Sequence, residues 1–234
     1  MPRWTALTVT VVLLAGCASG DPARDGPPPA SVRQIPTTTA GASTTATTAG
    51  ASTTTTTTPG DAAVEIRYRV ERRTTDAATA DFERVVAATL TDPRGWQRAG
   101  FAFVRDDSRD APYLLVLAEG DEVDRLCLPY DTYGEYSCQN GPVVALNANR
   151  WRLATSKWTG DIATYRQMLV NHEVGHLLGM RHPRPQCPSP GAPAPIMNQQ
   201  STELDGCLPN PWPLDAEIAD AARHDRKLAP GPGE

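Results

Sequence analysis

The sequence predicts one α+β domain that begins near residue 61 and takes up most of the chain. Short apolar segments with alternating or continuous hydrophobic patterns predict strands at 64–70, 101–105, 113–117 and 143–146. Two longer segments, 76–90 and 161–178, place apolar side chains at helical spacing. The remaining segment, Leu126–Cys138, alternates poorly and is predicted to be a looped hairpin. A Pro-rich, irregular stretch follows residue 179, and a short helix is predicted at 214–228.

The N-terminal segment has the pattern of an export signal. Residues 1–16 combine a cationic start with the apolar run Leu7–Leu14, which is too short to span a membrane as a helix. The run ends in Leu14-Ala15-Gly16-Cys17, which resembles a bacterial lipobox, whose cysteine is lipidated. Ordinary signal cleavage with an incidental Cys17 is the alternative. We expect lipidation at Cys17, which would anchor the protein to the outer face of the cell membrane.

The segment 17–60 is a predicted linker. Beyond Cys17 it consists mainly of Thr, Ala, Gly, Ser and Pro, and the sequence Ala-Gly-Ala-Ser-Thr-Thr occurs in it twice. Such a composition offers too few apolar side chains to form a core, so a disordered tether is expected. The domain is then assigned to 61–229, and 230–234 is expected to be a disordered tail.

The charge balance bears on the kind of partner. The chain has 22 Lys and Arg against 27 Asp and Glu, a net charge of −5. An acidic balance argues against nucleic acid as a partner and against binding to an anionic membrane surface by charge. About 170 residues outside the signal and linker are enough for one domain with its own core. We expect a monomer.

Four cysteines remain after Cys17 is assigned to the anchor. An exported protein meets an oxidising compartment, where an even number of cysteines favours disulfides. Four cysteines allow three pairings. The sequence-local one, Cys127 with Cys138 and Cys187 with Cys207, is favoured because each bond closes a short loop.

The eleven residues His172-Glu173-Val174-Gly175-His176-Leu177-Leu178-Gly179-Met180-Arg181-His182 form the pattern H-E-x-x-H-x-x-G-x-x-H. His172 and His176 lie one helical turn apart, so both can reach one metal ion. Gly179 suits the left-handed turn that ends a helix and would let His182 return as a third ligand. Three protein ligands and one open position are typical of a catalytic zinc site. The chance of the full pattern in a chain of this length is on the order of 10⁻⁵.

Glu173 is the predicted catalytic base. It projects about a hundred degrees around the helix from His172, where it can take a proton from a zinc-activated water that attacks a carbonyl. Protonation of the histidine ligands would make the activity fade below roughly pH 6. The bland alternative is a helix with two coincidental histidines. His224 lies in a polar helical pattern and is expected to be a surface histidine.

The motif at 172–182 resembles the zinc signature of the metzincin metallopeptidases. Pro195-Ile196-Met197-Asn198 resembles the methionine turn that this family places below the zinc. The resemblance implies a mixed, twisted sheet with a backing helix and an active-site helix. It also implies zinc as the cofactor, a protein or peptide as the substrate, and an antiparallel edge strand that binds extended substrate. By order, Leu126–Cys138 would supply that edge.

Three segments are more closely similar to an uncharacterised family of exported actinobacterial domains: 170–176, 194–200 and 210–213. Pro183 after His182, and the lack of a tyrosine two residues after Met197, match no named metzincin subfamily. The leading hypothesis is a membrane-tethered zinc endopeptidase. A non-catalytic, zinc-binding envelope protein that binds peptides or cell-wall components is the alternative. Hydrolysis of a cell-wall peptide amide is a third possibility.

Overall fold

The computed structural model describes residues 63–223. The predicted signal peptide, Cys17, the linker, His224 and the C-terminal tail lie outside these residues. In chain order the elements are β1 (Val64–Arg72), η1 (Ala77–Thr79), α1 (Phe82–Leu90), η2 (Trp96–Ala99), β2 (Phe101–Arg105), β3 (Tyr113–Ala118), α2 (Gly120–Cys127), β4 (Cys138–Asn140), β5 (Val143–Asn147), α3 (Ala148–Leu153), α4 (Ile162–Leu177) and α5 (Asp215–Arg223). This is an α+β fold, as predicted.

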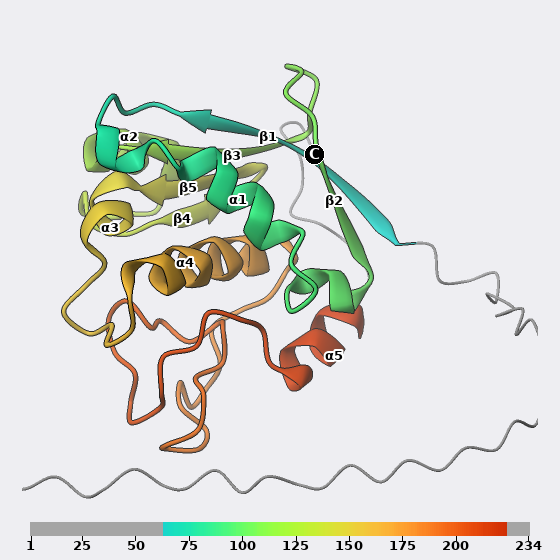
Figure 1. Ribbon diagram of the computed structural model, residues 1–234, viewed down its shortest axis with the longest axis vertical. Helices are drawn as coiled ribbons and strands as arrows, with labels where there is room; N and C mark the ends of the chain where they lie inside the picture. The colour runs from blue at the N-terminus through green and yellow to red at the C-terminus, as the bar shows by residue number, and fades with distance from the viewer. Residues whose placement is uncertain (1–62, 224–234) are drawn as a thin grey trace, which may run out of the picture. The chain divides into compact units, whose positions relative to one another are not determined.

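The five strands form one mixed sheet in the order β2-β1-β3-β5-β4 (Figure 1). Strand β1 lies between β2 and β3 and pairs in parallel with both, and β3, the central strand, also pairs in parallel with β5. Strand β4 is antiparallel to β5, with Gln139 opposite Val144. The short β4 therefore forms one edge of the sheet, next to the strand that leads into α3.

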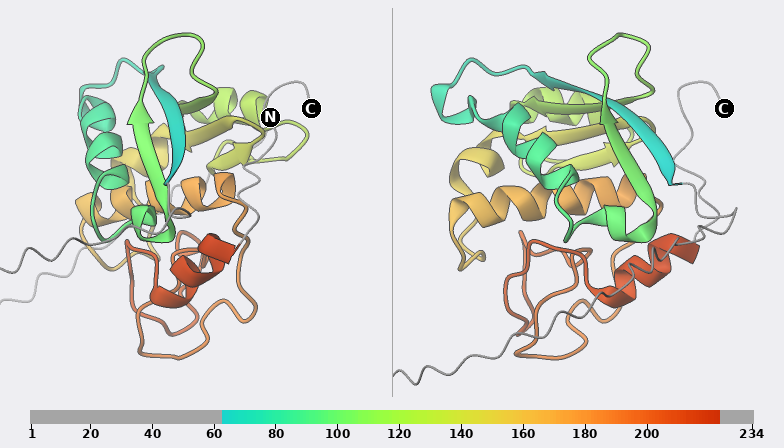
Figure 2. Two further views of the ribbon diagram at one scale, coloured as in Figure 1. Left: turned by 90° about the vertical axis from the view of Figure 1, so that its right-hand side faces the viewer. Right: turned by 45° about the vertical axis from the view of Figure 1, so that its right-hand side comes forward.

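Each face of the sheet is covered by helices. The larger core lies between the sheet and the helices α1 and α4, and includes Ile66, Tyr68, Leu115 and Leu146 from the strands. A smaller core on the opposite face packs Val116 and its neighbours against α2. The C-terminal segment and α5 lie on the side of α4 that faces away from the sheet (Figure 2). Helix α4, which carries the histidine motif, is thus enclosed between the sheet and the C-terminal segment.

The predicted helix at 76–90 is divided in two. Asp76 caps the short 3-10 helix η1 by accepting the N–H of Ala78 at 2.9 Å, and the α-helix begins only at Phe82. Between them, the side chain of Asp81 accepts hydrogen bonds from Arg166 on α4 and from Trp151 on α3. These two tertiary hydrogen bonds hold Asp81 in a position that a continuous helix would not give it. They account for the break between η1 and α1.

The predicted hairpin at Leu126–Cys138 is wrong. Helix α2 runs through to Cys127, a loop follows, and strand structure begins only at Cys138. Most of the acidic segment 119–124 forms the start of α2. The helix is highly charged and buries only Val123 and Cys127, one turn apart, so its helical pattern is weak. Helix α3 was also not predicted.

The segment after α4 has little regular structure, as its prolines predicted. One disulfide, Cys187–Cys207, and a bridge between Pro193 and Leu208 hold it together. The second disulfide, Cys127–Cys138, joins the end of α2 to the first residue of β4. Both match the favoured pairing. Among residues 63–223, no helix is long and apolar enough to cross a membrane.

Candidate metal centre

Helix α4 begins and ends where its sequence predicted. Asp161 is the N-cap, and its carboxylate accepts the N–H of Thr164 at 2.7 Å. At the other end, Gly179 has a φ of +87°, a left-handed conformation that favours glycine. The N–H of Gly179 bonds the carbonyl of His176, and the N–H of Met180 bonds that of Gly175. This pair of bonds is a Schellman turn, which reverses the chain and returns His182 toward the helix.

The three motif histidines converge at their Nε2 atoms. The Nε2 of His182 lies 3.1 Å from that of His176 and 3.2 Å from that of His172. Two of the rings are held from behind by backbone carbonyls. Nδ1 of His172 lies 2.8 Å from the oxygen of Ile196, and Nδ1 of His176 lies 2.9 Å from the oxygen of Met180. A carbonyl can only accept, so these bonds place the proton on Nδ1 and leave Nε2 with its lone pair.

This arrangement fits a metal ion. Three nitrogens bound tetrahedrally at 2.0 to 2.1 Å from one ion would lie about 3.4 Å apart, close to the observed spacings. The protons of His172 and His176 are on Nδ1, so both rings can offer an Nε2 lone pair to an ion placed between them. The cluster of His172, His176 and His182 could therefore hold a metal ion.

The electrostatics of the cluster favour neutral imidazoles. Burial lowers the pKa of His172 to about 3, and the neighbouring His176 adds to this effect. The pKa of His182 is lowered to about 4, again mainly by burial, and that of His176 is lowered as well. A metal ligand must be unprotonated. The lowered pKa values keep the three imidazoles neutral near neutral pH, so they can bind a cation there. Burial also raises the pKa of the Glu173 carboxyl to about 8.

Met197 lies directly beneath the helix that carries the ligands. It belongs to a tight turn in which the N–H of Asn198 bonds the carbonyl of Pro195 at 3.0 Å. A Cβ atom built on Gly175 would lie 2.3 Å from the sulfur of Met197 and 2.9 Å from the ring of Trp96. Only a residue without a side chain allows this approach. Gly175, an unspecified position of the motif, is thus required by the packing.

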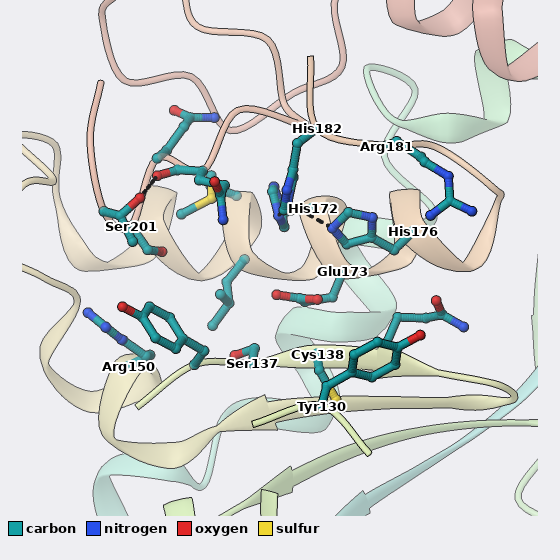
Figure 3. Close-up of a pocket in the computed structure, with 17 residues that line it drawn as sticks. Tyr130, Ser137, Cys138, Arg150, His172, Glu173, His176, Arg181, His182 and Ser201 are labelled. Carbon is teal, nitrogen blue, oxygen red and sulfur yellow. Dashed lines mark hydrogen bonds between the residues drawn. The ribbon is translucent and has the colours of Figure 1, made fainter. Parts of the chain in front are cut away.

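A cleft of about 360 Å³ opens beside the histidine cluster. Figure 3 shows Glu173 pointing into it, with α4 above and with Ser137 and Cys138, at the start of the edge strand β4, below. Arg150 and Ser201 lie toward one end, and Tyr130 and Arg181 toward the other. The cleft therefore runs past the cluster along β4.

A comparison with protein families gives one match. The family described as "protein of unknown function (DUF3152)" matches residues 34–220, which is well over half of the chain. The chain belongs to the DUF3152 family. A search of curated proteins found no match.

Glu217 is a residue of this DUF3152 chain that the sequence analysis did not single out. Its carboxylate, on α5, accepts three backbone N–H groups: those of Ile196 at 2.8 Å, Met197 at 2.9 Å and Leu214 at 2.9 Å. It therefore fixes the turn that carries Met197. Burial raises its pKa, and the three hydrogen bonds oppose that shift. A lone Glu in a short amphipathic helix gives no local signal of this role.

The site residues predicted for this DUF3152 chain fall into two groups. His172, His176 and His182 come together, with Glu173 and Met197 beside them. Cys17 lies outside the described residues. The structure adds Gly175, Glu217 and Arg150, each of which also contacts residues from another segment of the chain.

Proposed function

We propose that this protein is a zinc-dependent endopeptidase of the metzincin type. The observation that carries the proposal is the convergence of three imidazole Nε2 atoms beside a buried glutamate, both opening on one cleft. Nitrogen ligands in a three-plus-one arrangement favour zinc over calcium or magnesium, which prefer oxygen.

The cleft supports a peptide as the substrate. Strand β4 is at the edge of the sheet and lines the cleft through Cys138 and Gln139, opposite Glu173. An edge strand offers unpaired backbone groups on its outer side, to which an extended chain can add by backbone hydrogen bonds. A peptide laid along β4 would pass its carbonyl groups in front of the histidine cluster.

Glu173 would transfer a proton from the attacking water to the leaving group. A zinc ion held by the three imidazoles would supply Lewis-acid activation of the attacking water and of the peptide carbonyl. The Glu173 carboxylate would take the proton that the water loses and pass it to the departing amide nitrogen. The carbonyls of Ile196 and Met180 would hold two of the imidazoles in the required tautomer.

The decisive experiment measures zinc and cleavage separately. Purified protein should bind about one zinc ion per chain and cleave an unfolded protein substrate, and a chelator should stop the cleavage. Glu173→Ala should keep the zinc and lose the cleavage. His182→Ala should lose affinity for zinc, whereas His224→Ala, outside the motif, should not. Cleavage retained by Glu173→Ala would contradict the mechanism, and zinc binding without cleavage of a broad peptide library would favour a non-catalytic binding protein.

We further propose that the domain is held outside the cytoplasmic membrane by a lipid on Cys17. The lipobox-like sequence and the two disulfides support this location. Metabolic labelling with a fatty acid should mark the wild-type chain and not the Cys17→Ser variant.

A further inference from the structure

Arg150 brings a positive charge to the cleft. Strand β5 ends at Asn147, whose side chain caps α3 by accepting the N–H groups of Asn149 at 2.9 Å and Arg150 at 3.3 Å. This cap begins α3 directly at the end of β5, the strand next to the edge strand β4. It places Arg150 on the Ser201 side of the cleft, away from Arg181 (Figure 3).

The guanidinium of Arg150 has only a loose counter-ion, the carboxylate of Glu135, to which it does not hydrogen-bond. Its side chain is only 17% exposed, and its Nε donates to the carbonyl of Glu135 at 2.8 Å. The guanidinium carbon also lies 5.6 Å from the ring centre of Tyr136. The closest carboxylate oxygen, on the 68% exposed side chain of Glu135, is 3.7 Å from Nη2. Within residues 63–223, neither terminal nitrogen of Arg150 donates a hydrogen bond.

Other arginines with similar exposure are paired. Arg152, which is 19% exposed, bonds Glu119 at 2.9 Å through both of its terminal nitrogens. Arg166, which is 13% exposed, bonds Asp81 at 2.7 Å. Withdrawing a cation from water is costly unless an anion compensates. Arg150 faces the cleft with only the loose pairing to the exposed Glu135 as compensation.

The cleft as a whole suits an anion. Among the described residues that line it, Glu173 is the only carboxylate, and Arg150 and Arg181 are the cationic side chains. The chain carries a net charge of −5, so this balance is local to the cleft. A bound metal dication would make the cleft more positive still.

We propose that Arg150 forms a carboxylate-binding subsite beside the metal centre. The substrate class is then a peptide with a carboxylate close to the scissile bond, either an acidic side chain or a free C-terminus. The planar guanidinium can bind such a group through two parallel hydrogen bonds. This inference rests on the proposed peptidase function and deepens it.

The test uses binding, so it does not depend on turnover. The probes are pairs of peptides that carry a hydroxamate as the metal-binding group and have Glu or Gln as the residue next to it. One set carries the hydroxamate at the C-terminal end of the peptide, and the other set carries it at the N-terminal end. Calorimetry on the zinc-loaded protein should show that the Glu member binds about tenfold more tightly or better. A further pair, with a free or an amidated C-terminus, distinguishes a side-chain carboxylate from a terminal one.

Variants locate the effect. Arg150→Gln should abolish the preference for Glu over Gln, and Arg150→Lys should retain part of it. Arg181→Gln removes the same charge from the other end of the cleft and should change the preference much less. Glu135→Gln keeps the arginine, removes its weak competitor and should strengthen the preference. This last variant tests the subsite even if Arg150→Gln fails to fold.

The outcomes separate the two proposals. Equal binding of the Glu and Gln members to wild type would overturn the subsite and leave the peptidase proposal standing. A clear preference without cleavage of any acidic peptide would overturn the peptidase and leave the subsite. If no hydroxamate binds, both fall. Equal losses of preference in Arg150→Gln and Arg181→Gln would reduce the effect to general attraction and overturn the assignment to Arg150.

Discussion

Glu217 and His172 bond to opposite sides of one residue, Ile196. The Glu217 carboxylate accepts the N–H of Ile196 at 2.8 Å, and the carbonyl of Ile196 lies 2.8 Å from Nδ1 of His172. The C-terminal helix is thereby connected to a metal-ligand candidate through a single residue. Such a support restrains the orientation of the imidazole without contacting the metal.

Replacing Glu217 with Ala should loosen the candidate metal centre. The change leaves the N–H groups of Ile196 and Met197 buried without an acceptor, at about 1–3 kcal/mol each. We expect a lower melting temperature and a zinc affinity reduced by about 10-fold or more. Thermal unfolding and chelator competition measure the two effects. Glu203→Gln, at an exposed carboxylate, is the matched control, and unchanged zinc affinity in Glu217→Ala would show that the support is dispensable.

Gly175→Ala should destabilise the protein although Ala favours helices. The helix propensity gain is at most about 1 kcal/mol, while the added methyl group meets Met197 and Trp96 at overlapping distances. We expect a net loss of about 1–3 kcal/mol in unfolding free energy, measured with urea. Met197→Ala removes the sulfur that the new methyl group meets. In a double-mutant cycle the combined loss should therefore be smaller than the sum of the single losses, and strict additivity would refute the contact.

Glu173→Gln should stabilise the metal-free protein at neutral and alkaline pH. The folded state raises the pKa of Glu173 to about 8, against 4.5 for an ordinary Glu, so the folded protein retains a proton that the unfolded chain releases. The wild type then loses up to about 1.4 kcal/mol per pH unit between these values, and Gln does not titrate. Urea unfolding with a chelator at pH 5, 6.5 and 8 should show an advantage of Gln that grows with pH. A constant difference would contradict it.

The histidines should make zinc binding resistant to acid. The pKa of His172 is about 3 and that of His182 about 4 in the folded, metal-free protein, so protons compete with zinc only at low pH. Zinc affinity should change little from pH 7 to about pH 5. The sequence alone predicted that activity would already fade below roughly pH 6. Chelator competition across this range measures it. A steep fall in affinity below pH 6.5 would mean that the imidazoles titrate normally.

The lowered pKa values of His172 and His182 make stability depend on pH in the opposite direction to the raised pKa of Glu173. The unfolded chain binds protons at its histidines near pH 6.5, whereas the folded metal-free protein does not. Stability of the metal-free protein should therefore fall as the pH drops below 6.5. Wild type is then most stable near pH 6.5, and Glu173→Gln should remove the decline on the alkaline side and keep the fall in stability on the acid side.

The parts predicted from sequence are those set by local spacing. His172, His176 and Gly179 owe their positions to one helix and its end, and hydrophobic patterns sufficed for the sheet strands other than the short β4. Helix α2 was not predicted, because only two of its residues are buried and its hydrophobic pattern is therefore weak. The edge strand β4 is only three residues long, too short for an alternating pattern to show.

The remaining site residues depend on contacts between distant segments. Glu217 meets Ile196 across 21 residues, and Trp96 donates to the carbonyl of Asn171 across 75. Nothing around Arg150 in the sequence indicates that it faces a cleft, because its orientation follows from the Asn147 cap and from the end of β5. Sequence spacing therefore predicted the ligands of the candidate centre, and the fold was needed to find what surrounds them.

The two disulfides fasten both sides of the cleft. Cys138 begins β4, and the bond between Cys187 and Cys207 secures the loops that flank the turn of Met197. A newly made chain with free thiols would have the histidine motif but neither of the disulfides that hold the two sides of the cleft. Thiols remain reduced in the cytosol and oxidise outside it. If the chain is exported as proposed, both disulfides would form only after export, and the proposed activity would be absent from the cytosol during synthesis.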